Sequence, residues 1–259
     1  MTKNWIWTNF ITSSYNEVDI FLGFTQCKWN CVFCKKGESL VYFPRTEYSD
    51  SYYKFIYYAS DSEIDYEFFQ GFCKQPNLKI NISWNEPLSW DWLDFFITTI
   101  RNMLPQAIFV LRISNTLNIS HSITKNIDRI EFSIYGPNQD IHNKVVWSRD
   151  AWNILQNNIS VLKDNGLQNS IFFQTIVVKS NMQYVWETIK YISSLTTYPV
   201  KIVYPYFFPA DELFQLPQKS EILKEMLLQI DIGMLKNRCI MVNFSMSKKL
   251  EDLFCWVIK

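Results

Sequence analysis

Long apolar runs and a net charge are both absent from the sequence. No run approaches the roughly 18 residues that a membrane-spanning helix needs, and residues 1–9 lack the basic start and apolar stretch of a signal peptide. Lysine and arginine together number 25, as do aspartate and glutamate, so no overall field attracts nucleic acid or an anionic membrane. We therefore expect a cytoplasmic protein with neither nucleic acid nor a membrane as partner.

Cysteine is too scarce for a disulfide scaffold. The 259 residues contain six cysteines, and three of these (Cys27, Cys31 and Cys34) fall within eight positions. In the reducing cytosol such clustering indicates a metal site. The other three cysteines are isolated in the sequence: Cys73, Cys239 and Cys255. We interpret these three as buried or incidental thiols, with ligation of an auxiliary iron–sulfur cluster as the alternative.

Glycine is scarce as well, at six residues, and no linker rich in glycine, proline or serine divides the chain. No internal repeat occurs at the periods typical of solenoid proteins. A chain of this length can bury one sizeable core. We therefore expect a single domain over residues 1–259, with a core of about 16–210 and a C-terminal extension of about 211–259.

Apolar segments that alternate with helical patterns indicate repeated β/α units around a parallel sheet. The richness of these segments in isoleucine, valine and phenylalanine predicts strands buried on both faces. The sequence thus predicts an α/β fold, an open, incomplete (β/α)6-type parallel barrel. Seven strands are expected: Val18–Phe24, Lys79–Trp84, Ile108–Ser114, Arg129–Tyr135, Ile171–Val178, Val200–Tyr206 and Cys239–Phe244.

Helical spacing of apolar residues follows several of these strands. One helix is expected over 92–104, with Ser89 placed to cap it, and another opens at Asp150 and ends before Gly166, a position for a left-handed C-terminal cap. A third begins after Asn181. Two more are expected near 220–235 and 247–257.

A tyrosine-rich segment, 38–62, follows the cysteine cluster directly and carries six tyrosines. Two interpretations remain open. The segment covers the active site, or it is an ordinary insertion whose rings pack on the surface.

The cysteine cluster follows the first expected strand, so its thiolates belong to a loop at the carboxyl end of that strand, the ligand-binding end of α/β proteins. Three thiolates bind three irons of a cubane cluster and leave the fourth iron open to a small molecule. A structural zinc site is the alternative, and it needs a fourth ligand. His121 and His142 are the only histidines, and neither lies within the local spacing of common zinc modules.

The spacing Cys27-x3-Cys31-x2-Cys34, with Phe33 before the last cysteine, resembles the signature of the radical S-adenosylmethionine (SAM) superfamily. The resemblance implies a 4Fe-4S cluster held by the three cysteines, with SAM as second cofactor and Phe33 beside it. In that family, the reduced cluster cleaves SAM to methionine and a 5'-deoxyadenosyl radical, which abstracts hydrogen from the substrate.

Further matches follow in the order of the family's motifs, from about residue 18 to about residue 206. Glu86 in Trp84-Asn85-Glu86-Pro87 matches the acidic position of the family's Gly-Gly-Glu-Pro turn, which receives the SAM amino group. Two glycines of that turn are replaced by Trp84 and Asn85. Taken singly, Glu86 beside a proline is better explained as a solvated turn residue.

The remaining matches stand at the ends of later strands. Ser114 and Asn115 resemble the Thr-Asn of the molybdenum-cofactor and peptide-modifying branch, and Ser133 resembles the family's Ser-Leu-Asp-Gly ending. The resemblance implies that all three contact SAM and that Arg149 reaches the SAM carboxylate. The stretch around His142 resembles one in which a histidine precedes a basic residue. The structural alternatives are a Ser133 hydroxyl bonded to a neighbouring carbonyl and a surface position for His142.

The expected substrate is a peptide or a small metabolite, with a peptide slightly favoured because the motifs resemble the peptide-modifying branch. The family also implies an external electron donor similar to flavodoxin or ferredoxin. No N-terminal segment is large enough for a cobalamin domain. Two other functions remain open: a non-catalytic iron–sulfur or zinc-binding protein, and a degenerate family member that serves as a partner-binding module.

Overall fold

The computed structural model describes residues 17–22, 31, 55–59, 63–83, 86–113, 117–203 and 239–242. The expected helices near 220–235 and 247–257 lie outside these residues. The chain divides into two compact units, Met1–Cys27 with Leu40–Ile130, and Lys28–Ser39 with Glu131–Lys259. No helix in the described part of the chain is both long and apolar enough to cross a membrane.

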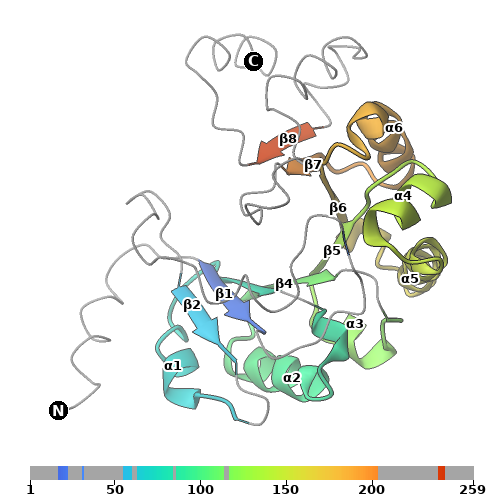
Figure 1. Ribbon diagram of the computed structural model, residues 1–259. Helices are drawn as coiled ribbons and strands as arrows, with labels where there is room; N and C mark the ends of the chain where they lie inside the picture. The colour runs from blue at the N-terminus through green and yellow to red at the C-terminus, as the bar shows by residue number, and fades with distance from the viewer. Residues whose placement is uncertain are drawn as a thin grey trace, which may run out of the picture. The chain divides into compact units, whose positions relative to one another are not determined.

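The first unit is a parallel sheet with helices on one face. Its strands are hydrogen-bonded in the order β2-β1-β3-β4, and Figure 1 shows α1 and α2 on one side of them. The strands are β1 (Glu17–Phe21), β2 (Phe55–Tyr58), β3 (Lys79–Ser83) and β4 (Ile108–Ile113). The helices are α1 (Tyr66–Gln70), the short 3₁₀ helix η2 (Pro87–Ser89), α2 (Leu93–Met103) and α3 (His121–Asn126).

Aromatic packing defines which face of this sheet the helices cover. The ring of Tyr57 on β2 lies 4.9 Å from Phe68 and 4.8 Å from Phe69 of α1, and 6.3 Å from Phe96 of α2, centroid to centroid. Tyr57 pairs with Ile20 of β1, so Ile20 and its alternate neighbours lie on the same face. These aromatic rings form the core of the first unit.

Helix α2 begins later than its expected cap. Its N-cap residue is Trp92, and Ser89 ends the 3₁₀ helix η2 instead. The Ser89 hydroxyl donates to the carbonyl oxygen of Glu86 at 2.8 Å. The expected cap at Ser89 was therefore wrong, because the hydroxyl is already bonded within the preceding turn.

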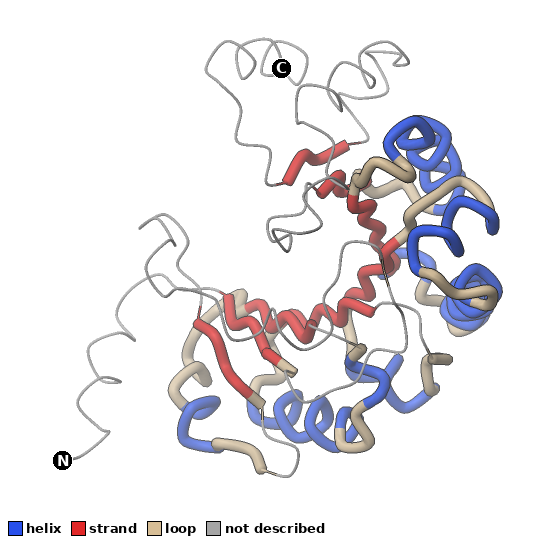
Figure 2. Tube along the Cα trace, viewed as in Figure 1, coloured by secondary structure: helices blue, strands red, loops and turns tan. Residues whose placement is uncertain are grey.

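The second unit repeats the arrangement, with strands in the order β5-β6-β7-β8 and parallel pairing of β6 with β7 and of β7 with β8. Figure 2 shows its helices on one side of β5 and β6. The strands are β5 (Arg129–Ser133, of which the last three residues belong to this unit), β6 (Ile171–Ile176), β7 (Val200–Val203) and β8 (Cys239–Val242). The helices are α4 (Gln139–Val146), α5 (Ala151–Asp164), η3 (Gln168–Ser170), η4 (Met182–Tyr184) and α6 (Val185–Leu195).

Two expected helix boundaries are confirmed in this unit. Asp150 is the N-cap residue of α5, and Gly166 has φ of +75° just beyond its end. A left-handed backbone at this position favours glycine, because a Cβ atom would be strained there.

The strands have one apolar and one polar face. In β1, Val18 and Ile20 are fully buried, whereas Glu17 and Asp19 are partly exposed. In β5, Ile130 and Phe132 alternate with Glu131 and Ser133, which are buried as well. The expectation of strands buried on both faces is confirmed for β3 and β5, in which every residue but the first is buried. The face away from the helices nevertheless carries charged and amide side chains.

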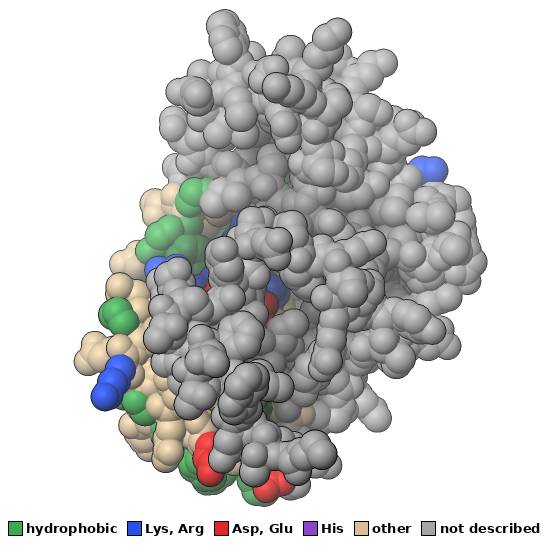
Figure 3. Space-filling view, turned by 90° about the vertical axis from the view of Figure 1, so that its left-hand side faces the viewer, with side chains coloured by type: hydrophobic (Ala, Val, Ile, Leu, Met, Phe, Trp, Pro, Cys, Tyr) green, Lys and Arg blue, Asp and Glu red, His purple; other side chains and the backbone are tan. Residues whose placement is uncertain are grey.

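All seven expected strands are present, and β2 is an eighth that the sequence analysis did not predict. It lies within the tyrosine-rich segment, where Tyr57 packs against the helices rather than on the surface. Figure 3 shows basic and acidic side chains on one face of the molecule, and among the residues drawn in colour the basic ones do not gather in one patch.

Candidate functional site

The carboxyl ends of β5 and β6 are joined by one buried side chain. Asn181, 1% exposed, donates from Nδ2 to the carbonyl oxygens of Tyr135 at 3.1 Å and Ile176 at 2.9 Å. Its Oδ1 accepts a hydrogen bond from the Val178 backbone N–H at 2.8 Å. Because the amide uses its donors and its acceptor on backbone groups, it holds the segments that follow both strands in a defined geometry.

His142 on α4 supports the same strand end and is not a surface residue. Its Nδ1 accepts a hydrogen bond from the Tyr135 backbone N–H at 3.2 Å, and the side chain is 1% exposed. Burial lowers the pKa of His142 to about 3. The ring lies between Tyr135 and Trp152, with centroids 5.5 and 5.6 Å away. His142 is therefore a neutral structural acceptor within the second unit.

Gly136 allows a close approach between this turn and α4. A Cβ atom at Gly136 would lie 2.6 Å from two side-chain atoms of Ile141 and 2.8 Å from the backbone nitrogen of His142. A side chain here would therefore displace the first turn of α4. The turn after β5 depends on glycine because of this contact.

Ser133 and Gln174 lie on the helix-free face of the second unit. Gln174 Nε2 donates to Ser133 Oγ at 2.9 Å, and the two side chains are 9% and 5% exposed respectively. The expected position of Ser133 on β5 is confirmed, and its hydroxyl is bonded to a neighbouring side chain. A hydroxyl group carries one donor proton and two acceptor lone pairs.

A buried ion pair lies on the same face. Lys201 Nζ on β7 is 2.8 Å from Glu131 Oε1 on β5. The Glu131 side chain is 2% exposed and that of Lys201 is 32% exposed. Gln174 on β6 pairs in register with Lys201, which places its side chain on the same face as the ion pair.

Glu86 follows β3 in the first unit and is completely buried. Its Oε1 accepts a hydrogen bond from the Leu88 backbone N–H at 3.2 Å, which caps the 3₁₀ helix η2. The interpretation of Glu86 as a solvated turn residue is therefore wrong. A buried carboxylate near the carboxyl end of a parallel strand is positioned for ligand binding.

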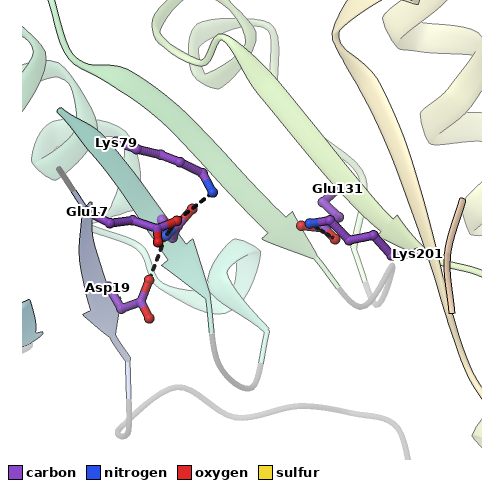
Figure 4. A network of polar contacts seen from close by, with 6 residues as sticks. Glu17, Asp19, Lys79, Glu131 and Lys201 are labelled. Atoms are coloured by element: carbon purple, nitrogen blue, oxygen red, sulfur yellow. Dashed lines mark hydrogen bonds and ion pairs between the residues drawn. The ribbon is translucent and has the colours of Figure 1, made fainter. Parts of the chain in front are cut away.

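A polar cluster that sequence analysis missed lies on the helix-free face of the first unit (Figure 4). Asn81 Nδ2 on β3 donates to Glu17 Oε1 at 2.9 Å and to Asp19 Oδ1 at 2.6 Å, both on β1. Lys79 Nζ lies 2.6 Å from Glu17 Oε1. The signal in the sequence was a polar residue at every second position of both strands. This alternation distinguishes the polar face of the sheet from the apolar face that packs against the helices.

Of the other candidate residues, the structure describes two. Cys31 is a half-buried thiol, and Arg149 is exposed between α4 and α5. Its backbone oxygen accepts a hydrogen bond from Asn143 Nδ2 at 2.7 Å. The remaining candidates lie outside the described residues: Cys27, Phe33, Cys34, Ser114 and Asn115.

Cys73 is an exposed thiol beyond α1, and its Sγ lies 3.7 Å from the Met103 carbonyl oxygen. Among the described residues, no group of three or more histidine, cysteine, aspartate or glutamate side chains could hold a metal ion. Of the other isolated cysteines, Cys239 is described only as part of strand β8, and Cys255 lies outside the described residues.

The fold has clear counterparts among solved structures. SuiB of Streptococcus suis bound to S-adenosylmethionine superposes with a TM-score of 0.58 at 10% identity, over 88% of this chain and 51% of SuiB. The enzyme anSMEcpe with bound AdoMet and Cp18Cys peptide gives 0.60 at 13% identity, over 88% of this chain and 63% of its own. Both are radical SAM enzymes.

The chain has the radical SAM fold. This confirms the α/β class and the open, parallel barrel expected from the sequence. The chain spans about half the length of SuiB and under two thirds of anSMEcpe. No family model and no curated protein matches the sequence.

Proposed function

We propose that this protein is a radical SAM enzyme that binds a 4Fe-4S cluster through Cys27, Cys31 and Cys34 and cleaves SAM reductively. The main support for this proposal is that the chain combines the radical SAM fold with a three-cysteine segment directly after β1. In α/β proteins the segments after the carboxyl ends of parallel strands bind the ligand.

The described residues fit these cofactors. Cys31 is a thiol that forms no disulfide, and cysteine thiolates are the side chains that hold iron–sulfur clusters. When bound, the cluster supplies the electron for cleavage of SAM. Glu86 would accept the SAM ammonium group. A carboxylate has about four lone-pair sites, so its bond to Leu88 N–H is compatible with that role.

The other proposed cofactor contacts follow from the same resemblance. Ser133, held by Gln174, would donate its hydroxyl proton to a polar group of SAM. Ser114, Asn115, Phe33 and Arg149 remain proposed SAM contacts. Asn181 and His142 are positioning residues in this scheme, because both bond to the backbone of Tyr135 just after Ser133.

We infer that the substrate is a peptide, with a small metabolite as the alternative. Support comes from SuiB, solved with precursor peptide SuiA, and from anSMEcpe, solved with the Cp18Cys peptide. The proposal includes an external donor of the flavodoxin or ferredoxin type. It also includes a cytoplasmic location and no nucleic-acid partner, in keeping with the balanced charge.

An anaerobic assay tests the proposal. The full-length protein is reconstituted with iron and sulfide, reduced and mixed with SAM, and 5'-deoxyadenosine is measured by mass spectrometry. We expect a product that Cys27→Ala, Cys31→Ala and Cys34→Ala abolish and Cys73→Ala leaves unchanged. Cys73 is the matched control, because it is a thiol of the described chain outside the proposed cluster. Bound zinc without SAM cleavage would refute the proposal in favour of a structural metal protein.

A further inference from the structure

The polar cluster of β1 and β3 contains a buried acceptor whose bonding is incomplete. Asn81 is 4% exposed, and among the described residues its Oδ1 accepts no hydrogen bond. A buried amide oxygen without a donor destabilises the folded state, because it has lost its hydrogen bonds to water. The two carboxylates fix the orientation of the Asn81 amide. Ionised carboxylates can only accept hydrogen bonds, so the amide nitrogen, and not the oxygen, faces them.

The surroundings of Asn81 Oδ1 favour a positively charged donor. The amide group that carries it is bonded to the carboxylates of Glu17 and Asp19. Lys79 pairs with Glu17, so the four side chains together carry one net negative charge. A metal ion is a poorer fit, since the cluster provides two carboxylates and no described group of three metal-binding side chains exists.

Another cation on this face, Arg112, lies farther along the sheet. Arg112 on β4 follows the register pair Ile82–Leu111, which places it level with Ser83 and nearer the carboxyl ends of the strands. Asn81 lies two residues before Ser83, or about 7 Å toward the amino end of the strand at the usual rise per residue. The cluster therefore lies deeper on the helix-free face than Glu86 and the end of β3.

We propose that Glu17, Asp19 and Asn81 form a subsite for a primary ammonium group of the substrate. Asn81 Oδ1 accepts one ammonium hydrogen, and the two carboxylates supply charge-assisted acceptors. This assignment rests on the proposed function, because it treats the helix-free face as the substrate side of the barrel. The ammonium group comes from a lysine side chain or from the α-amine of a peptide.

Binding of small amines to the purified full-length protein, without SAM or reductant, tests the subsite. Nα-acetyl-lysine amide presents only a side-chain ammonium, leucine amide presents only an α-ammonium, and Nα-acetyl-norleucine amide is the uncharged match. Affinities come from calorimetry, and the ¹⁵N shift of the Asn81 side-chain amide reports the place of binding. We expect one of the two amines to bind at least tenfold more tightly than the norleucine probe, which identifies the source of the ammonium.

Two variants complete the test. Asp19→Asn keeps the shape of the side chain and removes its charge, and Asn81→Ser removes the amide. Each should weaken amine binding at least tenfold. Glu67→Gln, at an exposed position of α1, removes a carboxylate outside the subsite and should leave amine binding unchanged. If Asn81→Ser fails to fold, as judged by circular dichroism, Asp19→Asn decides alone.

The subsite is refuted if the norleucine probe binds as tightly as both amines, or if Asp19→Asn binds them like the unaltered protein. It is also refuted if no probe shifts the Asn81 resonance, which would assign Asn81 Oδ1 to solvent alone. Because these measurements omit SAM, they do not depend on the cleavage assay. Amine binding without any 5'-deoxyadenosine would overturn the proposed enzyme and leave the subsite standing.

Discussion

Asn181 Nδ2 donates a hydrogen bond to the backbone oxygen of Tyr135, 46 positions earlier in the chain and 3.1 Å away. Together with its bonds to Ile176 and Val178, this contact joins the carboxyl ends of β5 and β6. The two strand ends cannot separate without leaving buried backbone groups unpaired. The Asn181 amide therefore contributes to the rigidity of the candidate site, together with the contacts of His142 and Gln174.

Asn181→Ala should destabilise the protein by about 2 to 3 kcal/mol, because three backbone groups lose their partner in a buried position. Urea unfolding followed by far-ultraviolet circular dichroism measures the change. Asn153→Ala on the exposed side of α5 is the control, and surface changes of this kind stay within about 0.5 kcal/mol. Equal stability of the two variants would show that the Asn181 bonds do not hold the strand ends.

Stability should fall as the pH drops below the ordinary pKa of histidine. The folded-state pKa of His142 is lowered to about 3, whereas an unfolded histidine titrates near 6.5. The unfolded chain therefore binds more protons between these values, and the stabilisation is complete above pH 6.5 and lost progressively toward pH 3. From pH 7.5 to pH 5 the expected loss from this group is about 2 kcal/mol.

His142→Asn tests the assignment, because the amide oxygen can replace Nδ1 as acceptor and does not titrate in this range. Unfolding free energies are compared at pH 7.5 and pH 5, and the variant should lose about 2 kcal/mol less than the unaltered protein. His121→Asn removes the other histidine, at the exposed start of α3, and should keep the full loss. A loss that is the same in all three proteins would contradict a buried neutral His142.

Lys201→Met should cost about 1 to 2 kcal/mol, since it removes a partly exposed cation that pairs with the buried Glu131 carboxylate. The double variant Glu131→Gln with Lys201→Met should recover most of that loss, because no buried charge remains. Lys163→Met at the end of α5 is exposed and serves as control. Strictly additive effects of the two single changes in urea unfolding would argue against direct coupling.

Glu86→Gln should weaken SAM binding more than it weakens cluster assembly. The amide keeps an oxygen that can cap the Leu88 N–H but loses the charge that attracts an ammonium group. SAM affinity, measured by equilibrium dialysis of the reconstituted protein, should fall about tenfold, which corresponds to about 1.4 kcal/mol. Iron content should be unchanged. Glu67→Gln is again the matched control, and unaltered SAM affinity in Glu86→Gln would remove the residue from the cofactor site.

The strands could be predicted because their helix-facing residues are strongly apolar. Val18, Ile20, Ile80 and Ile82 are all fully buried and alternate with polar side chains. Strand β2 was missed because it has four residues within a segment rich in tyrosine. Its place depends on parallel pairing with β1, a non-local contact that the segment itself does not signal.

The candidate site was predictable only in part. Motif order placed Glu86 and Ser133 near strand ends, as the structure does. Spacing could not show that Glu86 is buried or that Ser133 bonds to Gln174, because both depend on neighbours far along the chain. The role of His142 depends on the turn at Gly136, where backbone geometry decides the contact. The cluster at Asn81 was missed because the sequence analysis did not place Glu17, Asp19 and Lys79 on one face of the sheet.

In β1 and β3, the residues of the two faces differ in their role. Side chains toward the helices carry the packing, while Glu17, Asp19 and Lys79 face away from that core (Figure 4), and Asn81 is hydrogen-bonded to the first two on the same face. Replacing this second set would alter the proposed ammonium subsite with little loss of buried apolar area. A library limited to these four positions would therefore explore new ligands on an unaltered scaffold, and chains with this fold can diverge in substrate while their cores remain alike.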